Sequence, residues 1–223
     1  QIKYPDKFSE KINIFLDEVL PVGKTCSVAS GFGEREYWLI KNQKLKRQFY
    51  VSDLIFFREL KNIEIFIKNN ISKDRFKSIN HPVEAISLPY KDNIFDSAFS
   101  GSVIYALSND QCERHLREIL RVMKPSGVGV VWCYSWITPI MKLKLFLKNI
   151  IRNKNNKSFQ KFVGFLRDQK EFDKIINKVK NIEIIKIKKM HKRNSKNYKI
   201  PFMKKINLFF NYGVCIYVFK KTL

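Results

Sequence analysis

The stretch Thr25-Cys26-Ser27-Val28-Ala29-Ser30-Gly31-Phe32-Gly33 leads from a run of small residues into two glycines one residue apart. Residues 25–30 are typical of a buried strand, and residues 34–42 after the glycines are expected to form a helix. Glycines at a strand-to-helix turn let the backbone approach a ligand closely, and the following helix offers free N–H groups. The stretch therefore predicts an α/β unit with a ligand site after its first strand.

Strands and helices alternate on both sides of this stretch. A helix is expected before it over residues 8–20, where Pro21 and Gly23 end the pattern. After it come a strand, a helix, two strands, a helix and a strand, expected at 48–53, 54–70, 76–79, 95–103, 110–123 and 128–133. Asn109 and Asp110 are expected to cap the last helix, and residues 124–127 to form a turn. The alternation predicts a parallel sheet with helices on both faces.

The composition changes after Tyr134. Residues 137–168 are expected to be helical, with one apolar and one basic stripe. A core-facing helix around residues 172–179 follows, and then two strands separated by a basic loop at 190–205. The strands are expected at 182–187 and 213–219. Without an internal repeat or a linker, we expect one domain over residues 1–223.

Asp53 lies 20 residues after Gly33 at the end of the next expected strand, where a carboxylate can accept both hydroxyls of a ribose. No G-K-[S/T] follows the glycines, so a phosphate loop is excluded. Glu36 stands where the third glycine of a dinucleotide fingerprint would be, and Glu34 adds a second acid. Acids at this helix start would repel a pyrophosphate and tolerate a cationic sulfonium. The charges favour S-adenosylmethionine over NAD.

Two later stretches resemble a known family. Leu88-Pro89-Tyr90-Lys91-Asp92-Asn93-Ile94-Phe95-Asp96-Ser97-Ala98-Phe99 resembles the "LPF-x-D-x-x-F-D" stretch of class I S-adenosylmethionine-dependent methyltransferases of the small-molecule, type 11-like kind. Leu116-Arg117-Glu118-Ile119-Leu120-Arg121-Val122-Met123-Lys124-Pro125-Ser126-Gly127 is similar to that family's helix and "R-V-L-K-P-G-G" turn. The resemblance covers about residues 8–133. It implies a Rossmann-like, doubly wound, mostly parallel seven-stranded sheet with an antiparallel last strand and a helical insertion after strand five. Residues 1–133 would be the cofactor-binding core, and residues 134–223 the lid and the last two strands.

The resemblance also implies the positions that would hold S-adenosylmethionine. They are the glycine turn under the methionine part, the end of strand two at the ribose and, one residue later, beside the adenine, the loop after strand three at the adenine, and the end of strand four facing the methyl group. In this order the matching residues are Ala29, Ser30, Gly31 and Gly33; Asp53 and Leu54; Glu84 and Ala85; and Ser100. The alternative for Glu84 is a solvated loop carboxylate.

Two residues depart from the family's pattern. Ser27 stands where the family usually has an acid near the end of strand one, and Ala29 stands in place of a first glycine. A lost acid would weaken contact with the amino group of the methionine part. Three readings stay open: weak cofactor binding, a compensating group such as Glu34, or a degenerate, non-catalytic binding protein.

Tyr105 and Tyr134 lie where the family places residues that contact the methyl acceptor, and aromatic packing is the alternative. No catalytic residue is assigned. The candidate bases are the three histidines, of which His115 is expected to have a surface or packing role; the other two are His81 and His191. Cys133 follows strand five, but Ser100-Gly101-Ser102 replaces the Pro-Cys that RNA cytosine-5 methyltransferases need. Covalent base methylation is therefore disfavoured.

The formal charge of +23 is concentrated near the end of the chain: residues 141–223 carry +19 and residues 1–140 carry +4. One explanation of this charge is that the sequence uses lysine at surface positions in general. The other is that this part of the chain binds an anionic partner. We expect methyl transfer to a small-molecule, sugar or lipid-linked glycan acceptor of anionic character. The alternatives are an RNA substrate held by the basic surface, or a cationic helix at 137–152 resting on an anionic membrane.

The four cysteines show no C-x-x-C spacing and no pairing with histidine. They predict reduced thiols in a cytoplasmic protein, without disulfides and without a bound metal. The longest uncharged runs, residues 125–141 and 206–219, are shorter than the roughly 20 apolar residues of a membrane span. No transmembrane helix is expected, and the membrane alternative would place the protein peripherally on the inner membrane surface.

Overall fold

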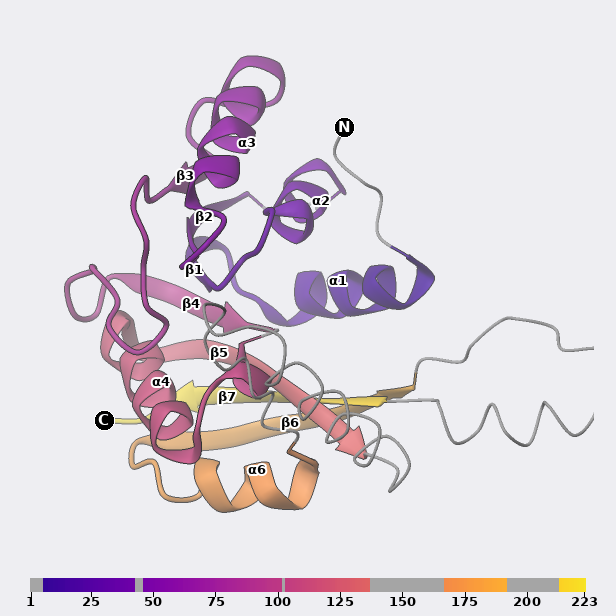
Figure 1. Ribbon diagram of the computed structural model, residues 1–223, viewed down its shortest axis with the longest axis vertical. Helices are drawn as coiled ribbons and strands as arrows, with labels where there is room; N and C mark the ends of the chain where they lie inside the picture. The colour runs from indigo at the N-terminus through magenta and orange to yellow at the C-terminus, as the bar shows by residue number, and fades with distance from the viewer. Residues whose placement is uncertain (1–5, 43–45, 102, 137–166, 192–212) are drawn as a thin grey trace, which may run out of the picture.

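The computed structural model describes residues 6–42, 46–101, 103–136, 167–191 and 213–223 (Figure 1). The helices are α1 Lys7–Val19, α2 Glu34–Asn42, α3 Phe57–Asn70, the 3-10 turn η1 Ile104–Ala106, α4 Asn109–Val122 and α6 Gln169–Ile176. The strands are β1 Gly23–Val28, β2 Arg47–Ser52, β3 Phe76–Ser78, β4 Phe95–Ser100, β5 Met123–Trp136, β6 Ile182–His191 and β7 Gly213–Lys221.

The strands form one seven-stranded sheet in the order β3-β2-β1-β4-β5-β7-β6. The first five are mutually parallel, and β7 runs antiparallel to both of its neighbours, β5 and β6. The expected Rossmann-like sheet with an antiparallel last strand is confirmed. Because β1 lies between β2 and β4, the strand order reverses at β1, and ligands of such sheets bind beyond the carboxyl ends of the strands there.

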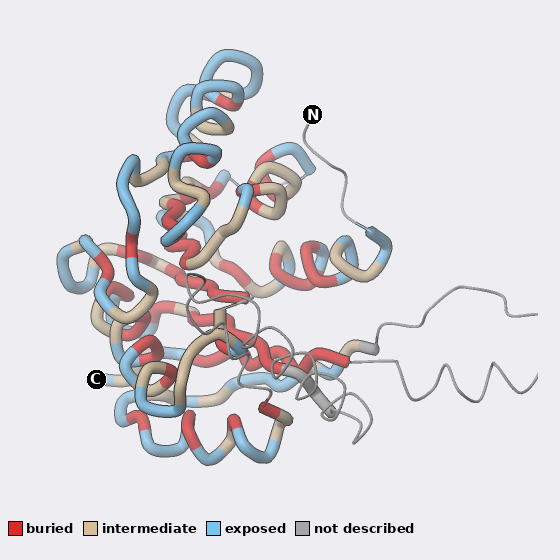
Figure 2. The backbone as a smooth tube through the Cα atoms, viewed as in Figure 1, coloured by how far each residue is buried: buried red, intermediate tan, exposed pale blue. Residues whose placement is uncertain are grey.

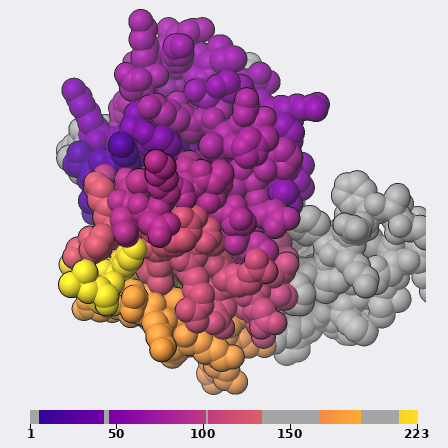
Figure 3. Space-filling view, turned by 90° about the vertical axis from the view of Figure 1, so that its left-hand side faces the viewer, coloured from indigo at the N-terminus to yellow at the C-terminus, as the bar shows by residue number. Residues whose placement is uncertain are grey.

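Helices cover both faces of the sheet (Figure 1). Side chains of α1, α2 and α3 pack on one face, and those of α4 and α6 pack on the other. Strand β5 shows the alternation that fills both layers, since Val130 and Trp132 join the first layer and Val131 and Cys133 the second. Figure 2 shows the central strands largely buried and the edge strand β6 largely exposed. Figure 3 shows α6, β6 and β7 at the opposite end of the molecule from α3.

Two local predictions are wrong. The residues expected as a turn at 124–127 lie within β5, where they bulge out between the pairs Phe95–Met123 and Ser97–Val128. The cap of α4 is Ser108, whose hydroxyl accepts from the backbone of Gln111 while the Gln111 side chain returns to the Ser108 backbone. A serine with a glutamine three residues later makes this capping box, so the cap lies one residue before the expected Asn109.

The C-terminal part is described only in pieces. The expected helix at 137–168 and the basic loop at 190–205 lie almost entirely outside the described residues, except that residues 190 and 191 end β6. Arg167 fastens the start of α6 to the chain after β4, where it donates to the carbonyl of Ile104 at 2.6 Å and to the carbonyl of Leu107. None of the helices described is long and apolar enough to cross a bilayer.

Candidate functional site

A cavity of about 460 Å³ opens at the carboxyl ends of β1 and β4. Its wall combines the start of α1, the end of β1 with the glycine turn, the first turn of α2 and the end of β4. The lining residues are Asp6, Ser9, Asn13, Ser27, Val28, Ala29, Ser30, Gly31, Phe32, Glu34, Arg35, Glu36, Phe99 and Gly101. The cavity therefore lies at the reversal of strand order, where the sequence placed a ligand site.

The glycine turn has the left-handed backbone that the site needs. Gly31 has φ +59°, and a Cβ placed there would meet no heavy atom within 4 Å, so this stretch of backbone faces open space. Gly33 has φ +70° and packs closely, since a Cβ would lie 2.9 Å from a methyl group of Leu60. Ala29 keeps φ at +55° although it is not a glycine. The departure at Ala29 thus leaves the form of the turn intact at the cost of some backbone strain.

Glu36 is buried beneath this turn. Its Oε1 accepts a hydrogen bond from the Ser27 hydroxyl, and the Ser30 hydroxyl lies 3.0 Å from the Ser27 Oγ. The second oxygen, Oε2, is buried and has no hydrogen-bond partner in the described part of the chain. Burial raises the pKa of Glu36, and the hydrogen bond from Ser27 opposes this shift. The acid that meets Ser27 is thus Glu36, whereas the expected compensating acid, Glu34, lines the same cavity.

Sequence reasoning did not single out Arg35. Its guanidinium lies 4.7 Å from the centre of a Trp132 ring, and its Nε donates to Asn13 Oδ1 at 2.9 Å. Burial lowers the pKa of Arg35, an effect opposed by the neighbouring Glu36. Two consecutive residues of α2 thus place a guanidinium and a carboxyl group in the cavity wall. One signal was available for Glu36, because it lies three and four residues before the core residues Leu39 and Ile40 and so shares their helix face.

Asp53 lies directly after β2 and joins the glycine turn. Its Oδ2 accepts from the Gly31 backbone N–H at 2.9 Å, while its Oδ1 accepts from the N–H groups of Ile55 and Phe56 at 2.9 and 3.2 Å. Asp53 is thus bonded to the glycine turn through Gly31. A carboxylate has about four acceptor positions, so roughly one remains for a ligand. Leu54 beside it is exposed.

The loop after β3 approaches the end of β2, since the Val83 N–H donates to the Asp53 carbonyl at 3.1 Å. The next residue, Glu84, has an exposed side chain. The Ala85 carbonyl lies 2.7 Å from His115 Nδ1, and Ser100 Oγ lies 3.0 Å from His115 Nε2. A carbonyl can only accept, so Nδ1 carries the proton and Nε2 accepts from the Ser100 hydroxyl.

His115 is fully buried, contrary to a surface role, and burial lowers its pKa to about 4. Ser100 is also fully buried and does not line the cavity. The two side chains therefore connect the end of β4 to the loop that carries Glu84.

The remaining predicted residues are less constrained. Tyr105 lies on η1 with 39% of its surface exposed, and burial of part of the ring raises the pKa of its hydroxyl. Tyr134 pairs with Val214 in the sheet, and His191 ends β6; the described side chains do not include these two. His81 is exposed. All four cysteines are free and buried, and burial raises the pKa of the Cys133 thiol.

The two stretches that carry the family resemblance are bonded to each other. Arg121 donates to the carbonyls of Tyr90 and Leu88 at 2.7 and 2.9 Å, and it pairs with Asp92 at 2.7 Å and with Glu118 at 2.8 Å. Glu118 in turn accepts from the Leu88 N–H at 2.8 Å. The arginine and the acid of α4 thus hold the loop before β4 in place.

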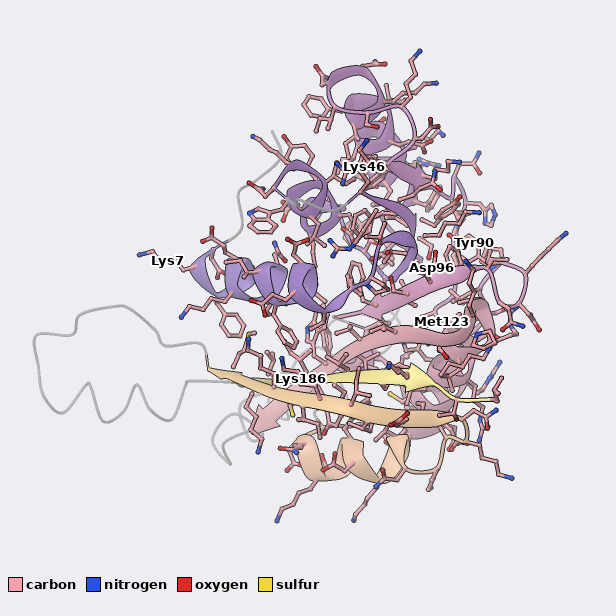
Figure 4. The ribbon with its side chains drawn as sticks, turned by 180° about the vertical axis from the view of Figure 1, so that it is seen from behind. Lys7, Lys46, Tyr90, Asp96, Met123 and Lys186 are labelled. Carbon is pink, nitrogen blue, oxygen red and sulfur yellow. The ribbon has the colours of Figure 1, made fainter. Side chains whose placement is uncertain are left out.

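On the α1 face of the sheet, lysines of β6 lie over an aromatic ring. The ammonium groups of Lys186 and Lys188 lie 5.2 and 4.2 Å from the centre of the Phe15 ring. Figure 4 labels Lys186, which extends from β6 on the side of the sheet that α1 covers. These two lysines pack through cation–π contacts and are more than a solvated charge run. Within the described residues, no three His, Cys, Asp or Glu side chains gather as metal ligands would.

A family model described as a methyltransferase domain matches residues 60–131. Among solved structures, a putative methyltransferase from Bacillus halodurans is 14% identical with a TM-score of 0.63, and the match covers 98% of this chain and 100% of that one. The [4+2]-cyclase SpnF is 15% identical with a TM-score of 0.67, over 96% of this chain and 82% of that one. Magnesium protoporphyrin IX methyltransferase from Synechocystis, solved with bound SAH, is 11% identical with a TM-score of 0.61, over 96% and 81%.

No curated protein matches the sequence. The likeness to these solved structures establishes the fold, and their names include one reaction, a [4+2] cyclisation, that is not methyl transfer. The residues of the cavity must therefore support any choice of reaction.

Proposed function

The chain has the class I methyltransferase fold and carries the methyltransferase domain over residues 60–131, and from this premise we propose that it transfers a methyl group from S-adenosylmethionine to a small anionic acceptor. The observation that carries the proposal is the cavity at the ends of β1 and β4, bounded by a glycine turn that Asp53 holds. The four free, buried cysteines support a reducing compartment such as the cytoplasm.

The residues present fit this cofactor. The open backbone at Gly31 admits a ligand, and the orphaned oxygen of Glu36 lies in a wall that also holds Glu34. Acids at the start of α2 disfavour phosphate groups and suit a ligand that carries positive charge. Asp53 would hold the ribose, with Leu54, Glu84 and Ala85 around the adenine. The turn from Ala29 to Gly33 would hold the methionine part, and Ser100 would support the methyl-transfer face.

The cofactor supplies a methyl group already activated by a sulfonium centre. The chain then needs to bind both reactants, align them and exclude water, since proximity and orientation account for much of such a rate enhancement. His115 does not act as the base in this proposal, because it is fully buried away from the cavity lining and both its ring nitrogens are already bonded, to Ala85 and Ser100. Burial also lowers its pKa to about 4, which makes it a weak base. None of the described residues that line the cavity is a histidine.

The acceptor is proposed as an anionic small molecule, a sugar or a lipid-linked glycan. The charge of +19 over residues 141–223 supports negative charge in the acceptor. Tyr105 and Tyr134 would contact the acceptor. A lipid-linked acceptor would bring the protein to an anionic membrane surface, where the basic segment adds attraction.

Thermal denaturation with S-adenosylhomocysteine tests the cofactor part. A ligand at about 100 times its Kd stabilises by about 2.7 kcal/mol. For a chain of this length, that raises the Tm by about 5–11 °C. Asp53→Asn should remove most of this shift, because the amide cannot accept from Gly31 and the ribose as the carboxylate does.

The matched control is Asp74→Asn, an exposed acid in the turn before β3, which should shift as the unchanged protein does. An unchanged protein that shows no shift would favour the non-catalytic binding protein. A panel of acidic and neutral acceptors with labelled cofactor then tests the acceptor class, and methylation of only neutral acceptors or of RNA would contradict the proposal.

A further inference from the structure

The cavity contains one acid that no partner explains. Glu36 is 1% exposed, and its Oε2 has no hydrogen-bond partner among the residues the structure describes. Buried polar atoms in folded proteins nearly always have a partner, so this carboxylate oxygen is available to a ligand that enters the cavity. That ligand has to be a hydrogen-bond donor, and positive charge would suit it best.

The carboxylate is held in position from two sides. Helix α2 carries it from one side, and the Ser27 hydroxyl at the end of β1 donates to Oε1 from the other. The Ser30 hydroxyl supports Ser27, lying 3.0 Å from its Oγ and 3.1 Å from its carbonyl oxygen. Ser27 stands at the position where the resembled family usually has an acid. The serine here thus orients an acid that enters from the next helix.

We propose that Glu36 binds the α-ammonium group of the cofactor's amino-acid end, in place of the strand-one acid that Ser27 replaces. The inference rests on the proposed function, since it assigns one subsite of that cofactor. Arg35 complements it, because its guanidinium lines the same cavity and the same end of the ligand carries a carboxylate. An amino-acid zwitterion presents both charges, and consecutive residues of α2 match them.

The test compares two ligands on matched variants by isothermal titration calorimetry. The ligands are S-adenosylhomocysteine and its analogue in which hydrogen replaces the α-amino group. Glu36→Gln keeps the shape and can still accept from Ser27, but it removes the negative charge. Glu34→Gln is the control, because Glu34 lies in the same cavity wall and the same first turn of α2.

For Glu36→Gln we expect the affinity for S-adenosylhomocysteine to fall by about thirtyfold or more, as for the loss of one partner of a buried charge pair. The affinity for the desamino analogue should stay within about twofold, the ordinary context spread of such contributions. Glu34→Gln should change the affinity for the two ligands by the same factor, because the inference places the ammonium group at Glu36 alone. The double variant Ser27→Asp with Glu36→Gln returns the acid to strand one and should recover affinity for S-adenosylhomocysteine.

If Glu36→Gln loses the same affinity for both ligands, Glu36 only supports the turn. If Glu34→Gln loses as much affinity for S-adenosylhomocysteine alone as Glu36→Gln does, the effect comes from the general field of the acids. Either result overturns the inference alone. Failure of the unchanged protein to bind S-adenosylhomocysteine would overturn the proposed function and this inference with it. If Glu36→Gln does not fold, Ser27→Ala gives the same comparison, since it frees the carboxylate from its orienting hydroxyl.

Discussion

Gly101 lies directly after β4, where the absence of a side chain makes room for Trp132. A Cβ at Gly101 would lie 2.5 Å from Trp132 Cε2 and closer still to Cζ2 and Cη2. The indole is 6% exposed and packs under the guanidinium of Arg35, so it cannot move without disturbing the cavity wall. The backbone of Gly101 is not in the left-handed region, so Gly101→Ala introduces a packing conflict without backbone strain.

Overpacking of this kind costs about 1–3 kcal/mol. For a chain of this length, the Tm should then fall by about 2–12 °C. Differential scanning calorimetry measures the fall, and a second background identifies its cause. In Trp132→Leu the indole is gone, so adding Gly101→Ala should cost less than about 1 kcal/mol, which leaves a coupling energy of about 1–2 kcal/mol between the two sites.

Gly31→Ala is the control for this experiment. Its Cβ would meet nothing within 4 Å, but its φ of +59° makes alanine unfavourable. It should cost about 1 kcal/mol through the backbone alone, and Trp132→Leu should not reduce that cost. The packing argument is refuted if Gly101→Ala denatures at the temperature of the unchanged protein, or if its cost is the same in both backgrounds.

Two further predictions concern the supports of the site. Because the pKa of His115 is lowered to about 4 in the folded protein, its contribution to stability is present above pH 6.5 and is lost as the pH falls from 6.5 towards 4. The free energy of urea unfolding of His115→Gln should therefore depend less on pH over that window. An unchanged pH profile would contradict the assignment. Arg121→Lys removes the forked contacts to Leu88 and Glu118 and should lower the free energy of unfolding, measured by thermal denaturation, by about 1–2 kcal/mol. The control Arg117→Lys alters an exposed pair on the same helix and should lower it by almost nothing. Equal effects of the two variants would show that the fork is unimportant.

The order of strands and helices was predictable because each element carries its own local pattern. The apolar run at 128–133, the glycine turn and the amphipathic α4 each indicate one element, and the resemblance indicated how the elements join. The predicted start of α4 was wrong because two adjacent residues, Ser108 and Asn109, are both favourable N-caps. The glutamine at 111 favours the serine. The bulge at 124–127 depends on pairing with β4, which periodicity within one segment cannot show.

The candidate site was only partly predictable for a related reason. Asp53 and Gly31 meet because they end adjacent parallel strands, a relation that follows from the fold class. The contact of Arg35 with Trp132 joins residues that are far apart in sequence, and the pairing of Glu36 with Ser27 depends on how α2 packs under the turn. These contacts are tertiary, so the spacing of residue types did not indicate them.

The position of Glu36 changes the weight of the departures from the family's pattern. The methyltransferase-domain match begins at residue 60, after the glycine turn and Asp53, so it leaves the first part of the site to physical argument. A cationic ligand requires a negative charge at one place in the cavity. Either β1 or α2 can supply it, because β1 ends and α2 begins at the same turn. Ala29 already has the backbone form of a glycine, and Glu36 is bonded to Ser27. Under the proposed role of Glu36, neither departure removes a group that cofactor binding needs. A motif search that scores only the strand-one acid would class this chain as degenerate, whereas the cavity retains the charge, and recovery of affinity in the Ser27→Asp, Glu36→Gln variant would show that the two positions are interchangeable.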